Sequence, residues 1–149
     1  MGIEEMADDI FELIKIASTA RARARSGNPE ELTEAEFLTL DVLTQQASLS
    51  VGEIQERVGV LPAQMSRIIR SLENKGDDAF VRCSINPQDR RRINVAIAPK
   101  GRNAHRAYRA LRRSFAIDIL HSLSPGDREQ FMRILSDIHA GISKRLSEM

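Results

Sequence analysis

Three consecutive arginines, Arg90, Arg91 and Arg92, form a short and strongly basic run in the sequence. They lie in INPQDRRRINVAIAP, residues 85–99, where Asn-Pro favours a turn and the alternation after Arg92 favours a strand. Guanidinium groups at the bend of a β-hairpin can contact an anionic surface, such as a narrow A·T-rich minor groove of DNA. The alternative interpretation is a hairpin with merely solvated charges. Arg90 and Arg91 are therefore candidate nucleic-acid contacts.

A second group of polar side chains lies upstream, in LPAQMSRIIRSLENKG, residues 61–76. Helical spacing predicts one apolar face that comprises Leu61, Met65, Ile68, Ile69 and Leu72. The opposite face carries Ala63, Arg67 and Arg70, with Gln64 and Ser66 beside it, and Pro62 suits the first helical turn. Arginine can bind guanine or phosphate, and glutamine can pair with adenine. A backbone N–H at the helix start can hold a phosphate.

Residue patterns typical of catalysis or of metal binding are absent from the sequence. His105, His121 and His139 lack the spacing of zinc ligands, and we expect each at the surface or in an interface. No serine has a base and an acid nearby, and no Gly-rich phosphate loop is present. We therefore expect no enzyme activity, no metal and no cofactor.

The single cysteine, Cys83, excludes an intrachain disulfide and suits a reducing compartment, so we expect a cytoplasmic protein. Because Arg82 precedes it, the thiol could have a lowered pKa and sense oxidants. The alternative, which we favour, is a small half-buried strand residue.

Five acidic residues among the first 20 argue against a secretory signal, and no apolar run is long enough to span a membrane.

The net charge of +1 conceals a strong asymmetry. Residues 61–113 hold 13 Lys and Arg against four acids, whereas the rest of the chain holds 9 basic and 17 acidic residues. A basic third on an otherwise acidic body favours a surface that faces a polyanion.

The elements that position these residues follow from local signals. Thr33 with Glu36, and Ser50 with Glu53, have the spacing of capping boxes and predict two helix starts. The second of these helices is short, ends near Gly59, and is followed by the helix that begins at Pro62. Phe80–Ile85 and Arg92–Ala98 are the predicted strands of the basic hairpin. A helix-turn-helix followed by a basic hairpin is a winged helix.

Long amphipathic helices are predicted at both ends of the chain. The first has an apolar stripe from Ile3 to Ala17 and should end near Ser26-Gly27-Asn28-Pro29. One C-terminal helix should start near Pro99, and another at Ser124-Pro125-Gly126-Asp127. Their stripes need a partner, and a second copy of the chain is the simplest one.

The chain resembles the MarR family of bacterial transcription regulators. Three segments carry the resemblance: LTEAEFLTLDVL, LPAQMSRIIRSLENKG and NPQDRRRINVAIAPKG. The family wing reads D-P-x-D-R-R and then V-x-L-T-x-x-G, and the matching residues are Asn86, Pro87, Asp89, Arg90, Arg91, Val95, Ile97 and Gly101.

The resemblance implies a mainly α (α+β) winged helix-turn-helix that acts as a single domain over residues 1–149. Residues 1–27 and 102–149 would form dimerisation helices, and residues 32–101 the DNA-binding lobe. A homodimer would bind a pseudo-palindromic operator, as a repressor, and a small aromatic or phenolic effector could release it. Recognition-helix contacts would come from Pro62, Ala63, Gln64, Ser66, Arg67 and Arg70, and wing contacts from Asp89, Arg90 and Arg91. In the family the wing aspartate holds the wing arginine by a salt bridge.

Three departures from the family pattern stand out. Ala98 replaces the usual Thr helix cap, so the junction after the wing should be weaker. The segment GDDAFVRC is about three residues longer than usual and contains Asp77 and Asp78. Redox-sensing relatives usually carry their reactive cysteine in the N-terminal helix, whereas Cys83 lies in the predicted first strand of the wing. Two further functions stay open: a winged helix that contacts protein without an operator, and an oxidant sensor that acts through Cys83.

Overall fold

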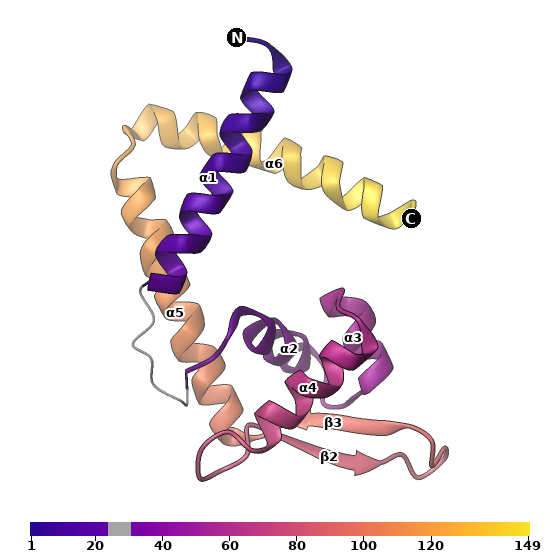
Figure 1. Ribbon diagram of the computed structural model, residues 1–149. Helices are drawn as coiled ribbons and strands as arrows, with labels where there is room; N and C mark the ends of the chain where they lie inside the picture. Colours follow the sequence, from indigo (N-terminus) through magenta and orange to yellow (C-terminus); the bar gives the residue numbers. More distant parts are fainter. Residues whose placement is uncertain (24–30) are drawn as a thin grey trace. The chain divides into compact units, whose positions relative to one another are not determined.

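The computed structural model describes residues 1–23 and 31–149, and the predicted end of the first helix near Ser26 lies outside them. Figure 1 shows the element order along the chain. The helices are α1 (Ile3–Arg23), α2 (Glu34–Gln45), α3 (Val51–Val58), α4 (Pro62–Glu73), α5 (Pro99–His121) and α6 (Pro125–Ser147). The strands are β1 (Leu49–Ser50), β2 (Val81–Ile85) and β3 (Ile93–Ile97). The predicted winged helix-turn-helix with long terminal helices is confirmed.

The wing is part of a three-stranded antiparallel sheet with the strand order β1-β3-β2. In the β2–β3 hairpin, Val81 lies opposite Ile97 and Ile85 lies opposite Ile93. The third strand, β1, was not predicted from the sequence, because it has only two residues before α3 begins. Leu49 in β1 pairs with Val95, so the start of the helix-turn-helix is hydrogen-bonded to the wing.

The core lies within residues 32–98, where α2, α3 and α4 pack against one another and against the sheet. It contains Leu32, Phe37, Leu40, Leu43, Leu49, Ile54, Met65, Ile68, Ile69, Leu72, Phe80, Val81, Val95 and Ala98. Burial of large side chains of this kind contributes roughly 1.5–3 kcal/mol each. The DNA-binding lobe predicted from the sequence thus has a core of its own.

Both predicted capping boxes are present. The Thr33 hydroxyl accepts from the Glu36 backbone N–H at 3.2 Å, and the Glu36 carboxylate accepts from the Thr33 N–H at 3.0 Å. Ser50 and Glu53 make the same reciprocal pair at the start of α3. Gly59 ends α3 in the left-handed conformation, with φ at 76°, which a side chain would oppose.

One member of the predicted apolar face of α4 is misplaced. Met65, Ile68, Ile69 and Leu72 are buried as predicted, but Leu61 is 73% exposed. The prediction extended the helical period one turn too far. Leu61 is the N-cap residue with extended backbone angles, and its side chain does not follow the stripe of the helix.

The prediction that His105 lies at the surface or in an interface is wrong, whereas His121 and His139 are exposed. His105, on α5, is buried within its own chain against α2. Its Nε2 lies 2.7 Å from Asp41 Oδ1, and its ring stacks on Phe37 with centroids 5.1 Å apart. A buried imidazole needs such a polar partner, which lies 64 residues away in sequence.

The junction between the wing and α5 is held by backbone contacts. The Ala98 N–H donates to the Phe80 carbonyl at 2.9 Å, and the Ala98 carbonyl accepts from the Arg102 N–H at 3.0 Å. Gly101 packs so closely on the Phe80 carbonyl that a Cβ would overlap it. The glycine of the wing motif is therefore a packing requirement, and the weakness expected at Ala98 stays a prediction.

The chain divides into two compact units, Met1–Arg106 and Ala107–Met149, with the boundary inside α5. No residue of α1 or α6 is buried among the described residues. Apolar side chains predicted to need a partner are exposed, and they include Ile10, Leu13, Ile14, Leu111, Phe115, Ile119, Phe131, Ile134, Leu135, Ile138, Ile142 and Leu146. Within residues 1–23 and 31–149, no helix combines the length and apolarity that a membrane span requires.

Candidate nucleic-acid interface

The outer face of α4 is formed by the residues that the sequence predicted. Its buried face anchors the helix on the core, so the remaining side chains point to solvent. The structure places Pro62, Ala63, Gln64, Ser66, Arg67 and Arg70 at the surface. An exposed helix face with two arginines and short polar neighbours can enter a major groove.

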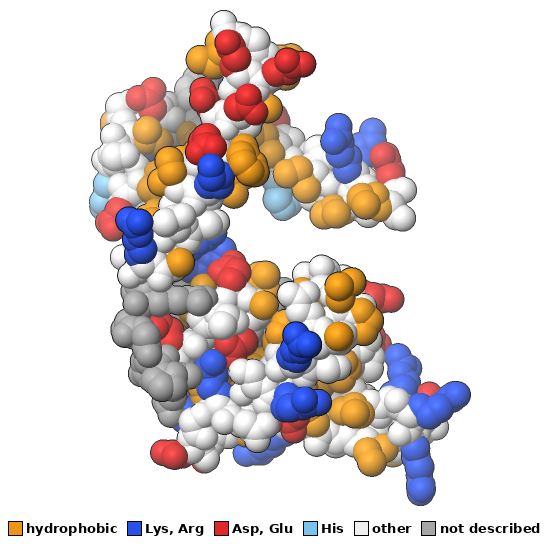
Figure 2. Space-filling view, in the orientation of Figure 1, with side chains coloured by type: hydrophobic (Ala, Val, Ile, Leu, Met, Phe, Trp, Pro, Cys, Tyr) orange, Lys and Arg blue, Asp and Glu red, His pale blue; other side chains and the backbone are white. Residues whose placement is uncertain are grey.

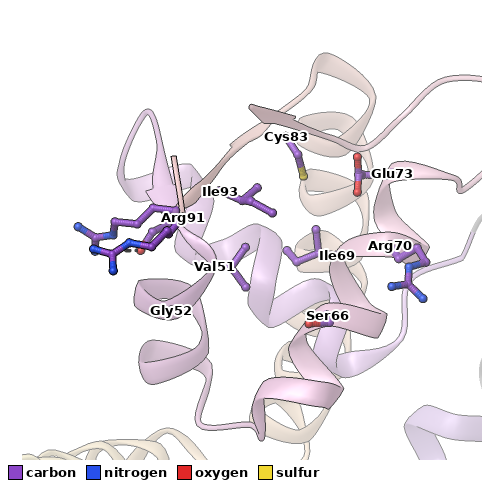
Figure 3. A pocket seen from close by; sticks show the side chains of 11 residues that line it. Val51, Gly52, Ser66, Ile69, Arg70, Glu73, Cys83, Arg91 and Ile93 are labelled. Carbon is purple, nitrogen blue, oxygen red and sulfur yellow. Dashed lines mark hydrogen bonds between the residues drawn. The ribbon is translucent and has the colours of Figure 1, made fainter. Parts of the chain in front are cut away.

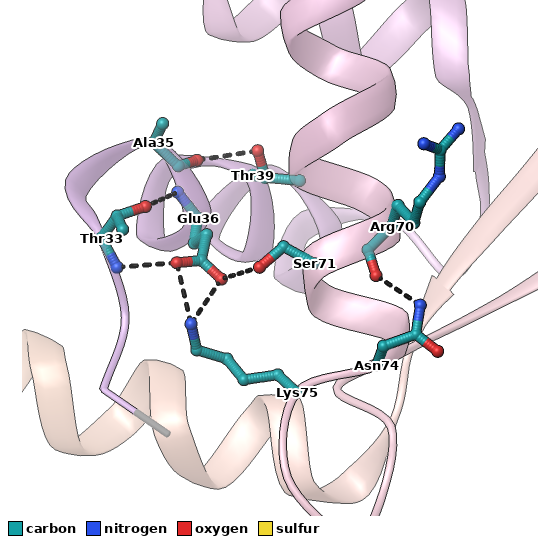
Figure 4. A network of polar contacts seen from close by, with 8 residues as sticks. All are labelled: Thr33, Ala35, Glu36, Thr39, Arg70, Ser71, Asn74 and Lys75. Atoms are coloured by element: carbon teal, nitrogen blue, oxygen red, sulfur yellow. Dashed lines mark hydrogen bonds and ion pairs between the residues drawn. The ribbon is translucent and has the colours of Figure 1, made fainter. Parts of the chain in front are cut away.

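A buried carboxylate fixes the far end of α4, as Figure 4 shows. Glu36, which is 3% exposed, accepts from Lys75 Nζ at 2.9 Å and from Ser71 Oγ at 3.3 Å in addition to its capping contact with Thr33. Lys75 is also largely buried and lies just beyond Asn74, the C-cap of α4. The Glu36 network (Thr33, Glu36, Ser71 and Lys75) therefore ties the end of α4 to the start of α2.

The turn of the wing is built by two short polar side chains. Asn86 Oδ1 accepts from the N–H groups of Gln88 at 2.9 Å and Asp89 at 3.2 Å. Asp89 Oδ1 accepts from the backbone N–H of Arg91 at 3.1 Å and from its Nε at 3.3 Å. These contacts leave the Arg91 side chain 92% exposed while they restrain its base. The Asp89 carboxylate thus contacts Arg91, two residues further along the chain.

Arg92 differs from Arg90 and Arg91 because its side chain contacts the N-cap residue of α3. Its Nη2 donates to the Ser50 hydroxyl at 3.5 Å, next to the start of α3. The backbone N–H of Ser50 chiefly lowers the pKa of Glu53, and the positive charge of Arg92 adds to that effect. Sequence reasoning missed this contact because 42 residues separate the two partners. Arg92 connects the wing to α3.

Figure 2 shows Lys and Arg side chains at the tip of the wing and others in the region of α3 and α4. A pocket of about 460 Å³ lies between the start of α3, α4 and the wing strands (Figure 3). Val51, Ile69 and Ile93 supply apolar lining, whereas Arg70 and Arg91 are shared with the candidate interface. The lining also includes the acidic side chain of Glu73.

Cys83 also lines the pocket, and its environment opposes the oxidant-sensor hypothesis. Burial and the neighbouring Glu73 carboxylate raise the pKa of the thiol to about 11. A thiol becomes reactive when its pKa is lowered, and Arg82 does not have that effect here. The structure favours the interpretation of Cys83 as a half-buried strand residue.

We expect Cys83 to react slowly with iodoacetamide at neutral pH. Only the thiolate reacts, so the rate should rise about tenfold per pH unit and level off only near the pKa of about 11. Stopped samples analysed by mass spectrometry between pH 7 and pH 10 measure this rate, with the urea-unfolded protein as the control. A plateau already at pH 7 would show an activated thiol and restore the sensor hypothesis.

Comparison with known proteins finds relatives among transcription regulators. The family model described as "MarR family" matches residues 32–93. An HTH-type transcriptional repressor of Mycobacterium tuberculosis, Rv2887, is 24% identical over 139 residues, which cover 93% of this chain and 98% of the relative.

Two solved structures share the fold. Streptococcus pneumoniae FabT, in complex with DNA, has a TM-score of 0.69 at 18% identity and covers 95% of this chain and 96% of its own. Bordetella bronchiseptica BpsR, whose DNA binding is regulated by 6-hydroxynicotinic acid, has a TM-score of 0.64 at 20% identity and covers 88% and 98%. Residues 32–93, which hold the helix-turn-helix and most of the wing, thus match the MarR family, and the whole chain is similar in sequence and fold to DNA-binding transcription regulators.

Proposed function

We propose that this chain is a repressor that binds a pseudo-palindromic operator as a homodimer. One observation carries the proposal: α4 and the wing expose their polar and basic side chains while separate networks hold each of them in place. Such a surface costs little ordering entropy on binding, which favours specific recognition. The interface comprises Pro62, Ala63, Gln64, Ser66, Arg67 and Arg70 on α4, with Asp89, Arg90 and Arg91 on the wing.

Each α4 side chain has a defined task in this proposal. Gln64 pairs with adenine, and Arg67 and Arg70 bind guanine edges or phosphates in the major groove. Pro62 and Ala63 are small enough to let the helix start approach the DNA backbone closely. Ser66, which has both donor and acceptor capacity, hydrogen-bonds to a base edge or a phosphate.

The wing reaches the minor groove next to each half-site. Arg90 and Arg91 enter the negative potential of a narrow A·T-rich groove, and Asp89 orients the Arg91 side chain. This geometry is supported by the exposure of Arg91 and by its contact with Asp89 at 3.3 Å.

Arg91→Ala is expected to weaken operator binding by about 1–3 kcal/mol, because it removes a charge held in contact distance of the groove. Fluorescence anisotropy at fixed salt measures the affinity. Arg133→Ala is the matched control, since Arg133 is also exposed and lies 3.7 Å from its own carboxylate partner, Asp137. Equal affinities of Arg91→Ala and wild type would show that Arg91 does not contribute to operator binding.

The exposed stripes on α1, α5 and α6 support the homodimer in this proposal, because a second copy would bury them. Sedimentation velocity with and without an operator duplex tests it. Wild type should sediment as a dimer and bind one duplex per two chains. Glutamates at Leu135 and Ile138 should yield monomers, whereas glutamates at Ser136 and Ala140, on the opposite face of α6, should not. A wild-type monomer at micromolar concentration would contradict the proposal.

A small aromatic or phenolic acid is proposed as the effector that releases the operator. The pocket beside α4 supports this function, because a ligand there would occupy Arg70 and Arg91 and compete with DNA. BpsR, which shares the fold, is regulated by 6-hydroxynicotinic acid, and that compound is a suitable first probe. Its binding to wild type by calorimetry, and loss of binding in Ile69→Ala with Arg70→Ala, would support the site. Full operator binding at saturating probe would contradict competition.

A further inference from the structure

Leu61 is an unusual residue for its position. It is the N-cap of α4, and among the described residues no side chain accepts a hydrogen bond at this cap. The same chain uses hydroxyls elsewhere: Thr33, Ser50 and Ser124 each cap a helix through the backbone N–H three residues on. Leucine is among the poorest N-cap residues, whereas serine is among the best.

The Leu61 side chain makes no evident contribution to the stability of the fold. Its side chain is 73% exposed, so it contributes little to the core on which α4 rests. Pro62 supplies no N–H, and the Leu61 carbonyl already accepts from Met65 at 2.9 Å, as any residue there would. A serine would keep the backbone contacts and add the missing cap. The choice of leucine therefore requires a role outside the stability of this chain.

The surroundings of Leu61 indicate what its side chain contacts. Leu61, Pro62 and Ala63 form an exposed apolar corner at the N-terminus of the recognition helix, directly before Gln64 and Arg67. In a helix-turn-helix, it is this end of the second helix that contacts base edges. The C5-methyl of thymine is the apolar group that a base pair presents in the major groove.

We propose that Leu61 recognises thymine by contact with its C5-methyl group in the operator. This inference rests on the proposed function, because it requires α4 in the major groove. It makes the apolar corner a specificity determinant that adds to the polar contacts of Gln64 and Arg67. A missing helix cap is then the structural cost of a thymine contact.

Uracil in place of thymine removes only the methyl group, so it tests the contact directly. The probe is the duplex that wild type enriches from a random pool, with each thymine in turn replaced by deoxyuridine. Wild type should lose affinity about fourfold at one thymine position per half-site, the effect of withdrawing one methyl group from apolar contact. Leu61→Ser should bind the thymine and uracil duplexes equally.

Two controls separate this role from a structural one. Leu61→Ser should unfold at the same temperature as wild type or a higher one, because it restores a cap. Ile85→Thr removes another exposed apolar side chain, from the wing, and should keep the full uracil response because the minor groove displays no methyl group.

The outcomes are distinguishable. An enriched duplex without a uracil-sensitive thymine, or a sensitivity that persists in Leu61→Ser, overturns the thymine contact and leaves the proposed function intact. Failure of wild type to enrich any duplex overturns both.

Discussion

Replacement of both Arg67 and Arg70 by alanine is expected to lower operator affinity about 30-fold or more. Each arginine that contacts guanine or phosphate contributes about 1–3 kcal/mol, and each 1.4 kcal/mol is a factor of ten. Both side chains are exposed on the outer face of α4, whereas Ile68 and Ile69 between them are buried. The double variant should therefore keep its fold, which circular dichroism can verify.

The control for this prediction removes the same charge elsewhere. Arg102→Ala with Arg106→Ala deletes two exposed arginines of α5 and changes the net charge equally. Anisotropy titrations at several salt concentrations compare the two double variants on the selected operator and on an unrelated duplex. The α4 variant should lose discrimination between the two duplexes, and the α5 variant should keep it. An equal loss in both would mean that Arg67 and Arg70 act only through overall charge.

Glu36→Gln is expected to be the most destabilising of the conservative substitutions considered. It removes the charge that faces Lys75 in a site where the two side chains are 4% and 10% exposed. Removal of one partner from a buried ion pair costs about 3 kcal/mol or more, because the other charge is left uncompensated. For a lobe of this size that corresponds to a fall in melting temperature of about 10 °C or more. Differential scanning calorimetry measures the change.

Two further variants identify the cause of the Glu36 effect. Adding Lys75→Met to Glu36→Gln should recover much of the stability, since the unpaired ammonium is then gone. Glu53→Gln removes the same capping carboxylate from α3, where it is exposed, and should have a much smaller effect. If Glu53→Gln lowered the melting temperature as much as Glu36→Gln, the contact with Lys75 would not be the important one.

Local signals in the sequence were sufficient to predict the helices, the β2–β3 hairpin and the outer face of α4, but not the short strand β1. The capping boxes at Thr33 and Ser50, the turn at Gly59 and the wing turn at Asn86 depend on residues within four positions of one another. Signals between residues this close in sequence can be recognised without a structure. The wing motif carried the resemblance to the MarR family, because its spacing of Asp, Arg and Gly is specific.

Contacts between distant segments could not be predicted in the same way. Glu36 with Lys75, Asp41 with His105, and Ser50 with Arg92 join residues that are 39, 64 and 42 positions apart. Glu36 and Ser50 already had a local explanation as helix caps, and Arg92 as part of the basic run, so their types indicated no second partner. The prediction for Leu61 was wrong for a different reason. Helical periodicity placed it on the buried face of α4, but Leu61 is the N-cap residue, and its extended backbone angles do not continue that face.

Selection of DNA from a random duplex pool, with purified protein at near-physiological salt, tests the central claim most directly. Enrichment of a two-fold symmetric motif with half-sites about one helical turn apart is the predicted result, because two copies of α4 would enter successive major grooves. A folded dimer that enriches no sequence would contradict operator recognition. The exposed arginines of α4 and the wing would then be explained by an acidic protein partner.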